Sequence, residues 1–290
     1  METLVLILQI VVLLVIIVFG LSALNSALQH RRRQIERVRT IRRLERARGS
    51  RVITMIHRQE RLSFLGIPLV QFIDVEDAEQ VLRAIRLTPR NTPIDLILHT
   101  PGGLALSSQQ IAFALNDHPA PVTVMVPHYA MSGGTLIALA ADRIMMDRNA
   151  VLGAVDPQIG RIQSSWPAAS ILAAAGTKGV ENLDDNTLIM VDIASKAVHQ
   201  MREFVAFLLK DKMPADKVQA VAETMAGGVW THDYPLNVPF LQSLGLPVVA
   251  EVPAEVYRLM SLYPQPRVAR PSVDYIPIPY QRRTGRDDQR

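Results

Sequence analysis

The stretch that decides the fold is Pro-His-Tyr-Ala-Met-Ser-Gly-Gly-Thr at positions 127–135, followed later by Val-Leu-Gly-Ala-Val-Asp-Pro-Gln at 151–158. An apolar strand, Pro121–Val126, is predicted before it and a helix, Thr135–Ala141, after it. Ser132 would then stand at a sharp strand-to-helix turn, where a hydroxyl is presented to substrate as in a nucleophile elbow. The glycines let a backbone approach closely, and the helix N-terminus offers free N–H groups to an oxyanion.

The same order of strand, glycine turn and helix occurs one unit earlier in the chain. Ile94–His99 predicts a buried strand, Thr100-Pro101-Gly102-Gly103 a turn, and Leu104–Leu115 a helix. Repetition of this order about every 25–30 residues is typical of βαβ units with a parallel sheet. Ligands bind at the carboxyl ends of such strands. We therefore expect an α/β fold in which the Gly102–Gly103 turn and Ser132 face one crevice.

Weaker patterns complete the predicted domain, which we place at residues 51–263. Strands are predicted at Arg51–His57, Ile144–Met146 and Val248–Val252. Helices are predicted at Val75–Ile85, Asn186–Lys212, Pro214–Met225 and, capped by Thr231 or Asp233, up to Leu244. Between them, 161–185 is predicted to be a loop or flap on the substrate side. Residues 264–290 hold five prolines and many charges, which predicts a disordered tail.

The N-terminus carries a run of 22 residues without a charge, Thr3 to Leu24. As a helix this run would be about 33 Å long, enough for a hydrocarbon core of about 30 Å. It does not resemble a cleaved signal peptide, because the run is too long and the charged residue before it, Glu2, is acidic. Residues 1–27 are therefore predicted to be a transmembrane anchor.

An arginine-rich segment follows this anchor directly. Ten arginines lie between Arg31 and Arg51, against Glu36 and Glu45, and we predict a basic juxtamembrane helix at 28–50. By the positive-inside rule the protein is a single-pass plasma-membrane protein with its N-terminus outside and its domain in the cytoplasm. The arginines would contact anionic lipid. Aromatic residues are not interleaved with them, so nucleic acid is not an expected partner.

Composition excludes several other kinds of site. The chain of 290 residues has no cysteine, which excludes disulfides and thiolate metal sites. Neither metal-ligand spacing, a phosphate loop nor a dinucleotide fingerprint occurs in the sequence. We therefore expect no metal and no cofactor.

Three pieces stand in order along the chain: Pro-Gly-Gly at 101–103, Ser-Gly-Gly at 132–134, and Gly-Ala-Val-Asp-Pro-Gln at 153–158. Over residues 51–252 the chain resembles the Clp-protease/crotonase superfamily, and within it the membrane-anchored serine dehydrogenase proteinase family, related to signal peptide peptidases. The resemblance implies a Clp/crotonase-like fold of repeated ββα and βαβ units, and a homo-oligomer. It also implies Ser132 as nucleophile, with oxyanion N–H groups from Gly102 or Gly103 and from Gly133.

The base that would activate Ser132 stays open at this point. Where Clp proteases carry a histidine, this chain has Asp156, and the serine dehydrogenase proteinase order of Ser, Asp and His implies Ser132, Asp156 and then His232. The signal peptide peptidases use a lysine instead, for which Lys196 is the first candidate and Lys178, in a glycine loop, the second. Lys196 has polar neighbours at one-turn spacing, which also favours a solvated lysine paired with Asp192.

The other histidines are weaker candidates. His99 and His128 lie at predicted strand ends, where structural histidines are common, and His199 lies on the polar face of the long predicted helix.

The sequence thus predicts a membrane-anchored serine endopeptidase acting on peptide or membrane-protein substrates. Two alternatives remain: a catalytically silent membrane scaffold with the same fold, and a crotonase-like enzyme acting on an acyl-CoA thioester.

Overall fold

A parallel sheet of five strands forms the centre of the domain, as expected from the repeated strand–turn–helix order. The computed structural model describes residues 2–57, 62–64, 67–69, 72–161 and 164–263, so the predicted tail at 264–290 lies outside the described residues. The strands run in the order β1-β4-β5-β7-β12, each parallel to its neighbour. They are β1 (Arg51–Ile56), β4 (Ile94–His99), β5 (Val122–Val126), β7 (Arg143–Met146) and β12 (Val248–Val249).

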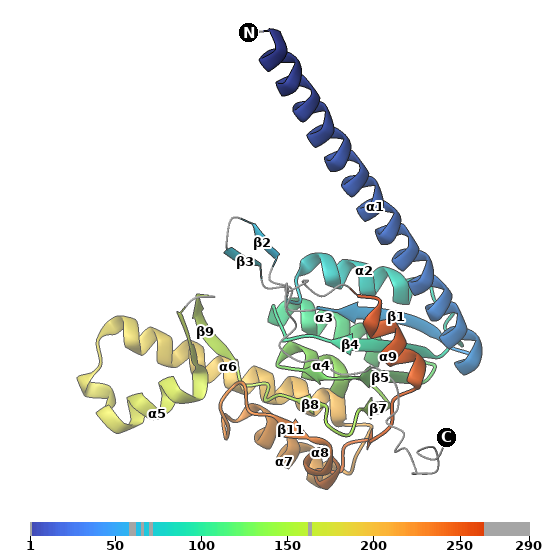
Figure 1. Cartoon of the computed structure of the whole chain (residues 1–290). Helices are drawn as coiled ribbons and strands as arrows, with labels where there is room; N and C mark the ends of the chain where they lie inside the picture. Colours follow the sequence, from blue (N-terminus) through green and yellow to red (C-terminus); the bar gives the residue numbers. More distant parts are fainter. Residues whose placement is uncertain (1, 58–61, 65–66, 70–71, 162–163, 264–290) are drawn as a thin grey trace, which may run out of the picture.

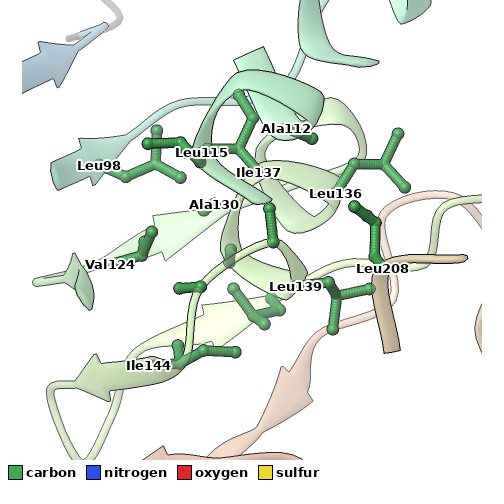
Figure 2. Close-up of a cluster of buried hydrophobic side chains, with 14 of the residues drawn as sticks. Leu98, Ala112, Leu115, Val124, Ala130, Leu136, Ile137, Leu139, Ile144 and Leu208 are labelled. Atoms are coloured by element: carbon green, nitrogen blue, oxygen red, sulfur yellow. The ribbon is translucent and has the colours of Figure 1, made fainter. Parts of the chain in front are cut away.

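Helices cover one face of this sheet. These helices are α2 (Val75–Arg86), α3 (Ala105–Asn116), α4 (Gly133–Leu139), α6 (Asp185–Leu209) and α7 (Ala215–Ala226). Side chains alternate along each strand, so Leu98, Val124 and Ile144 point toward α3 and α4 (Figure 2). Leu136 and Ile137 of α4 are fully buried in this cluster, which fixes α4 at the centre of the domain.

The opposite face is covered by the C-terminal end of α1 (Glu2–Arg48) and by α9 (Ala254–Ser261). Leu44 of α1 and Leu259 of α9 pack with Ile97 and Met125 of the sheet. The sequence analysis did not predict α9. This helix has only eight residues, and its apolar side chains are buried against α1 and the sheet. Helix α9 therefore packs the end of the domain against the C-terminal end of α1.

Helix α1 joins the predicted anchor and the predicted basic helix without a break (Figure 1). Within the described residues it is the one helix long and apolar enough to cross a membrane, and its most apolar window is not buried against the domain. At its other end, the Arg48 guanidinium donates to both carboxylate oxygens of the buried Asp95, at 2.5 and 3.0 Å. The Ser50 hydroxyl donates to the same carboxylate. These bonds attach the C-terminal end of α1 to β4 of the sheet.

Smaller elements surround the sheet. A three-stranded sheet joins β6 (Tyr129–Ala130), β8 (Val151–Leu152) and β11 (Leu236–Asn237). Two antiparallel hairpins are formed by β2 (Leu62–Phe64) with β3 (Ile67–Leu69) and by β9 (Gln158–Arg161) with β10 (Ser164–Pro167). The remaining helices are α5 (Ala168–Lys178), the 3₁₀ turn η1 (Val180–Asn182) and α8 (Val238–Ser243).

Three local predictions were wrong. The segment 161–185, predicted as a loop or flap, contains α5, because Ala168 packs with Ala194 and Val198 of α6 in a small core of its own. Helix α5 and the first part of α6 project from the side of the domain (Figure 1). The helix expected from Thr231 or Asp233 begins at Val238, since β11 keeps the preceding residues extended and Asn237 is its N-cap. The strand predicted at Val248–Val252 ends at Val249.

Candidate active site

Ser132 occupies the strained turn that the sequence predicted. Its backbone has φ 50° and ψ −116°, and among the described residues it is the one non-glycine residue with a positive φ. Such a conformation costs about 1–3 kcal/mol and persists only where neighbours hold it. The Met131 N–H donates to the Thr100 carbonyl at 3.0 Å, and the Thr135 N–H donates to the Ser132 carbonyl at 2.8 Å. These hydrogen bonds hold the turn on both sides of Ser132.

A cavity of about 520 Å³ opens beside Ser132. Its walls come from the two glycine turns, from α3, α4 and α6, and from the segments around positions 156 and 232. The lining residues are Pro101, Gly103, Leu104, Ala105, Gln109, Ser132, Gly133, Leu136, Val155, Asp156, Pro157, Gln158, Ile159, Ala197, Gln200, Met201 and His232. The expectation that the Pro-Gly-Gly turn and Ser132 share one crevice is therefore met.

Asp156 and His232 meet in this cavity although 76 residues separate them. The His232 Nδ1 lies 2.9 Å from the Asp156 Oδ1. The aspartate side chain is 1% exposed, whereas the histidine side chain is 35% exposed. A buried carboxylate bonded to one ring nitrogen fixes the orientation and tautomer of an imidazole, and leaves the other nitrogen available for proton transfer.

Two residues that the sequence analysis did not single out position Asp156. The Gln158 side-chain amide donates to the Asp156 Oδ2 at 2.7 Å, so both carboxylate oxygens are engaged. The Thr135 hydroxyl, buried in α4, lies 3.0 Å from both the N–H and the carbonyl oxygen of Gly153. The first turn of the Ser132 helix is thus bound directly to the strand end that carries Asp156. In the sequence, the only signal for Gln158 is its position two residues after Asp156.

The three glycines proposed from the motif have different surroundings. Gly103 and Gly133 line the cavity, but Gly102 does not. The Gly102 N–H donates to the Thr100 hydroxyl at 3.2 Å, and its carbonyl accepts from the Ile73 N–H at 2.8 Å. Gly102 has φ 107°, and a Cβ there would lie 2.9 Å from the Ser132 Cβ. Gly102 therefore shapes the turn, while the backbone at Gly103 and Gly133 faces the cavity.

The lysines lie away from the cavity. Lys196 donates to Asp192 at 2.6 Å, and its side chain is 67% exposed. Lys178 ends α5, also outside the cavity lining. Burial lowers the pKa of Lys212 to about 8, but its ammonium donates to the Leu139 carbonyl at the far end of α4 from Ser132. The described structure thus places the imidazole of His232, and none of these three ammonium groups, in the cavity wall.

The weaker histidine candidates also lie outside the cavity lining. The rings of His99 and His128 pack edge to face at 5.6 Å, and His99 also packs against Tyr129. His199 lies on α6 beside Glu203, exposed to solvent. In the part of the chain that the structure describes, no group of three or more His, Asp or Glu side chains could hold a metal ion.

Comparison with known proteins identifies the family of this chain. A family model described as ClpP-like SDH-type serine proteinase matches residues 1–290. A protein of Methanocaldococcus jannaschii, the uncharacterized protein MJ1495, is 60% identical over 253 residues, which cover 87% of this chain and 85% of that protein. A second uncharacterized protein of the same organism, MJ0137, is 52% identical over 258 residues, covering 89% of each.

Solved structures show weaker likeness. A mutant of the 1510-N membrane-bound stomatin-specific protease is 20% identical, with a TM-score of 0.44 over 66% of this chain and 79% of that one. ClpP1 from Listeria monocytogenes is 13% identical, with a TM-score of 0.43 over 72% of this chain and 96% of that one.

The family match covers the whole chain, from α1 through the two glycine turns to the C-terminus. It confirms both the family and the Clp-like α/β fold with one long apolar N-terminal helix that the motifs indicated. The protein is therefore a member of the ClpP-like SDH-type serine proteinase family.

Proposed function

We propose that this protein is a membrane-anchored serine endopeptidase in which Ser132, His232 and Asp156 act together. The observation that carries the proposal is the bond between the buried Asp156 and His232, in the same cavity as the strained Ser132. A nucleophile needs a base within reach and a third group that orients that base. Lys196, the alternative base, is exposed and bonded to Asp192, which favours the histidine.

The reaction would be acyl transfer in two steps. The Ser132 hydroxyl oxygen attacks the scissile carbonyl carbon while His232 takes its proton, and the same proton passes to the leaving amine as the C–N bond breaks. Water, deprotonated by His232, then releases the acyl group from the serine oxygen. Asp156 stabilises the imidazolium that forms in each step, and Gln158 keeps the carboxylate oriented.

The oxyanion donors would be the backbone N–H groups of Gly103 and Gly133. Both glycines line the cavity, on either side of the serine turn. Gly102, the other candidate, already donates its N–H to Thr100, so Gly103 is the better donor on that turn. Rigid donors at a developing oxyanion are commonly worth about 3 kcal/mol each.

The cavity favours an apolar side chain next to the scissile bond. Leu104, Leu136, Val155, Ile159 and Met201 contribute apolar walls, while Gln109 and Gln200 add amide groups that can bond a peptide backbone. We therefore assign an apolar peptide segment as the substrate class. A segment of a membrane protein fits this class and the location of the enzyme.

Helix α1 would hold the site close to the membrane. Glu36 of this helix forms an ion pair with Arg258 of the domain at 3.7 Å. About 11 residues of helix separate Glu36 from the end of the apolar run at Leu24, which corresponds to about 16 Å. The exposed Arg31 and Arg32 lie in this spacer and would contact anionic lipid on the cytoplasmic face of the plasma membrane, with the N-terminus outside. Several copies in one membrane would form a homo-oligomer.

A fluorophosphonate probe tests the nucleophile directly. We expect full-length protein in lipid nanodiscs to be labelled, and Ser132→Ala to lose all labelling with unchanged far-UV circular dichroism. Lys196→Met is the matched control, because it removes the alternative base at an exposed position, and it should be labelled at the wild-type rate. Cleavage of an internally quenched peptide with both ends blocked, at an apolar residue, would establish endopeptidase activity.

Different results would favour the alternatives. Wild-type protein that is neither labelled nor able to cleave the peptide would support the catalytically silent scaffold. Hydrolysis of an acyl-CoA thioester without peptide cleavage would support the crotonase-like enzyme. Loss of labelling in Lys196→Met with an intact fold would indicate that Lys196, and not His232, is the base.

A further inference from the structure

A buried chain of hydrogen bonds leads from α2 to the Pro-Gly-Gly turn, outside the residues assigned to catalysis. His57 follows β1, and its side chain is only 8% exposed. Its Nε2 lies 3.1 Å from the Asp77 Oδ2 in the first turn of α2, and its Nδ1 lies 2.9 Å from the Thr100 hydroxyl. Thr100 is fully buried, and its hydroxyl accepts from the Gly102 N–H at 3.2 Å. The order of groups is therefore Asp77, His57, Thr100 and Gly102.

The protons of this chain can be assigned from its acceptors. Burial alone would raise the pKa of Asp77, but bonds from His57 and the Asp74 N–H hold it below the ordinary value, so the carboxylate is ionised at neutral pH. An ionised carboxylate only accepts, and therefore Nε2 of His57 carries a proton. The Thr100 hydroxyl lies 2.9 Å from the His57 Nδ1 and 3.3 Å from the Gly102 carbonyl oxygen, and it accepts from the Gly102 N–H at 3.2 Å. The hydroxyl is therefore held between the imidazole and both polar backbone groups of Gly102.

The Thr100 end of this series of hydrogen bonds contacts the serine turn at several points. Thr100 pairs with Ala130, its carbonyl accepts from the Met131 N–H, and its own N–H donates to the Tyr129 carbonyl at 3.2 Å. A Cβ on Gly102 would lie 2.9 Å from both the Met131 carbonyl oxygen and the Ser132 Cβ. A small shift of the Gly102 backbone would therefore change the position of the Gly103 N–H relative to Ser132.

We infer that His57 and Thr100 are positioning residues that hold the Pro-Gly-Gly turn at the distance from Ser132 required by the oxyanion. This inference rests on the proposed function, because it assigns a role in the same reaction. The groups that hold the turn would then lie outside the cavity, since His57, Asp77 and Thr100 do not line it. The carboxylate of Asp77 orients the imidazole, and the imidazole orients the hydroxyl.

The test compares Thr100→Val with a matched threonine variant. Valine keeps the shape of Thr100 and removes its hydroxyl, while Thr88→Val removes another buried hydroxyl that bonds the Ala84 carbonyl at 2.8 Å, away from the cavity. A displaced oxyanion donor weakens only the transition state, so kcat for a quenched peptide should fall about 10- to 100-fold with KM within about 2-fold. Thr88→Val should leave both constants unchanged, and Thr100→Ser should restore most of kcat.

Hydrogen exchange supplies a second readout that does not require activity. In Thr100→Val the amide of Gly102 loses its acceptor, so we expect faster exchange in the peptide spanning residues 99–104 and not in the Thr88→Val protein. If Thr100→Val fails to fold, His57→Gln serves in its place. His118→Gln is then the control, because His118 bonds the Thr92 carbonyl at 2.8 Å outside the cavity lining.

The outcomes separate this inference from the proposed function. Faster exchange together with a kcat-specific loss supports it. Unchanged exchange overturns it, whether or not the enzyme is active. Faster exchange with unchanged kcat in an active enzyme also overturns it, while leaving the proposed function in place. Wild-type protein without Ser132-dependent labelling would defeat the proposed function and, with it, the role in catalysis assigned here.

Discussion

Two histidine–aspartate pairs in this molecule have nearly the same bond length and different surroundings. His232 lies 2.9 Å from Asp156, and His57 lies 3.1 Å from Asp77. The His232 ring is 35% exposed at the cavity, whereas the His57 ring is 8% exposed beneath α2. In the first pair the carboxylate is the more deeply buried partner, and in the second pair it is the imidazole.

The second ring nitrogen decides what each pair can do. The His57 Nδ1 is occupied by the Thr100 hydroxyl, so both of its nitrogens have partners. Within the described residues, no hydrogen bond is found for the Nε2 of His232, which can therefore exchange a proton with a serine or with a leaving amine. A base must have a nitrogen available, while a positioning residue is most effective when both are engaged. Under the two proposals, the same chemical pair would serve two purposes.

Removal of the cavity histidine should have the largest effect. His232→Ala eliminates the proposed base, and we expect kcat for a quenched peptide to fall about 10⁴-fold. The melting temperature should also fall, because the buried Asp156 carboxylate loses one of its partners. His199→Ala, at an exposed position on α6, is the control and should retain full activity. Retention of turnover by His232→Ala would break the distinction between the two pairs.

Replacement of the buried carboxylate should cost somewhat less. Asp156→Asn keeps the shape but loses the charge and can present the wrong tautomer of His232, so we expect kcat to fall about 10³-fold. KM should stay within about 2-fold, because Asp156 orients the base. Measurement of kcat and KM on the same peptide checks both expectations. A change in KM alone would indicate that Asp156 acts in substrate binding.

The candidate site residues carried more sequence signal than the groups that hold them. Ser132 and the glycine turn carry local signals, since a serine between a strand and a helix requires small neighbours. Asp156 and His232 were named through the family resemblance, but their contact across 76 residues could be seen only in the fold. His57 gave no signal as a positioning residue, because its partners come from α2 and from the end of β4.

The fold shows the same division between local and distant causes. The parallel sheet follows from apolar runs with glycine turns, and its strands are found where those runs occur. Helix α5 was missed because its stability comes from Ala194 and Val198 of α6, not from its own pattern. The start of α8 was misplaced because β11 pairs with Leu152, far away in sequence. Contacts between distant segments overrule local propensity in each case.

The smallest expected effect concerns the stability of the buried pair in acid. The folded pKa of Asp77 lies below its ordinary value of 3.8, as bonds from His57 and the Asp74 N–H outweigh the effect of burial. The unfolded chain therefore binds more protons between these two pKa values, and acid favours unfolding. The stabilisation is present above about pH 4 and is lost as pH falls through the folded pKa. Asp77→Asn should melt about 3 °C below wild type at pH 7, and this difference should shrink as the pH falls through the folded pKa of Asp77. Asp192→Asn, at an exposed position on α6, should differ little from wild type at either pH. A difference for Asp77→Asn that stays constant as the pH is lowered through this range would mean that the charge of Asp77 does not hold His57.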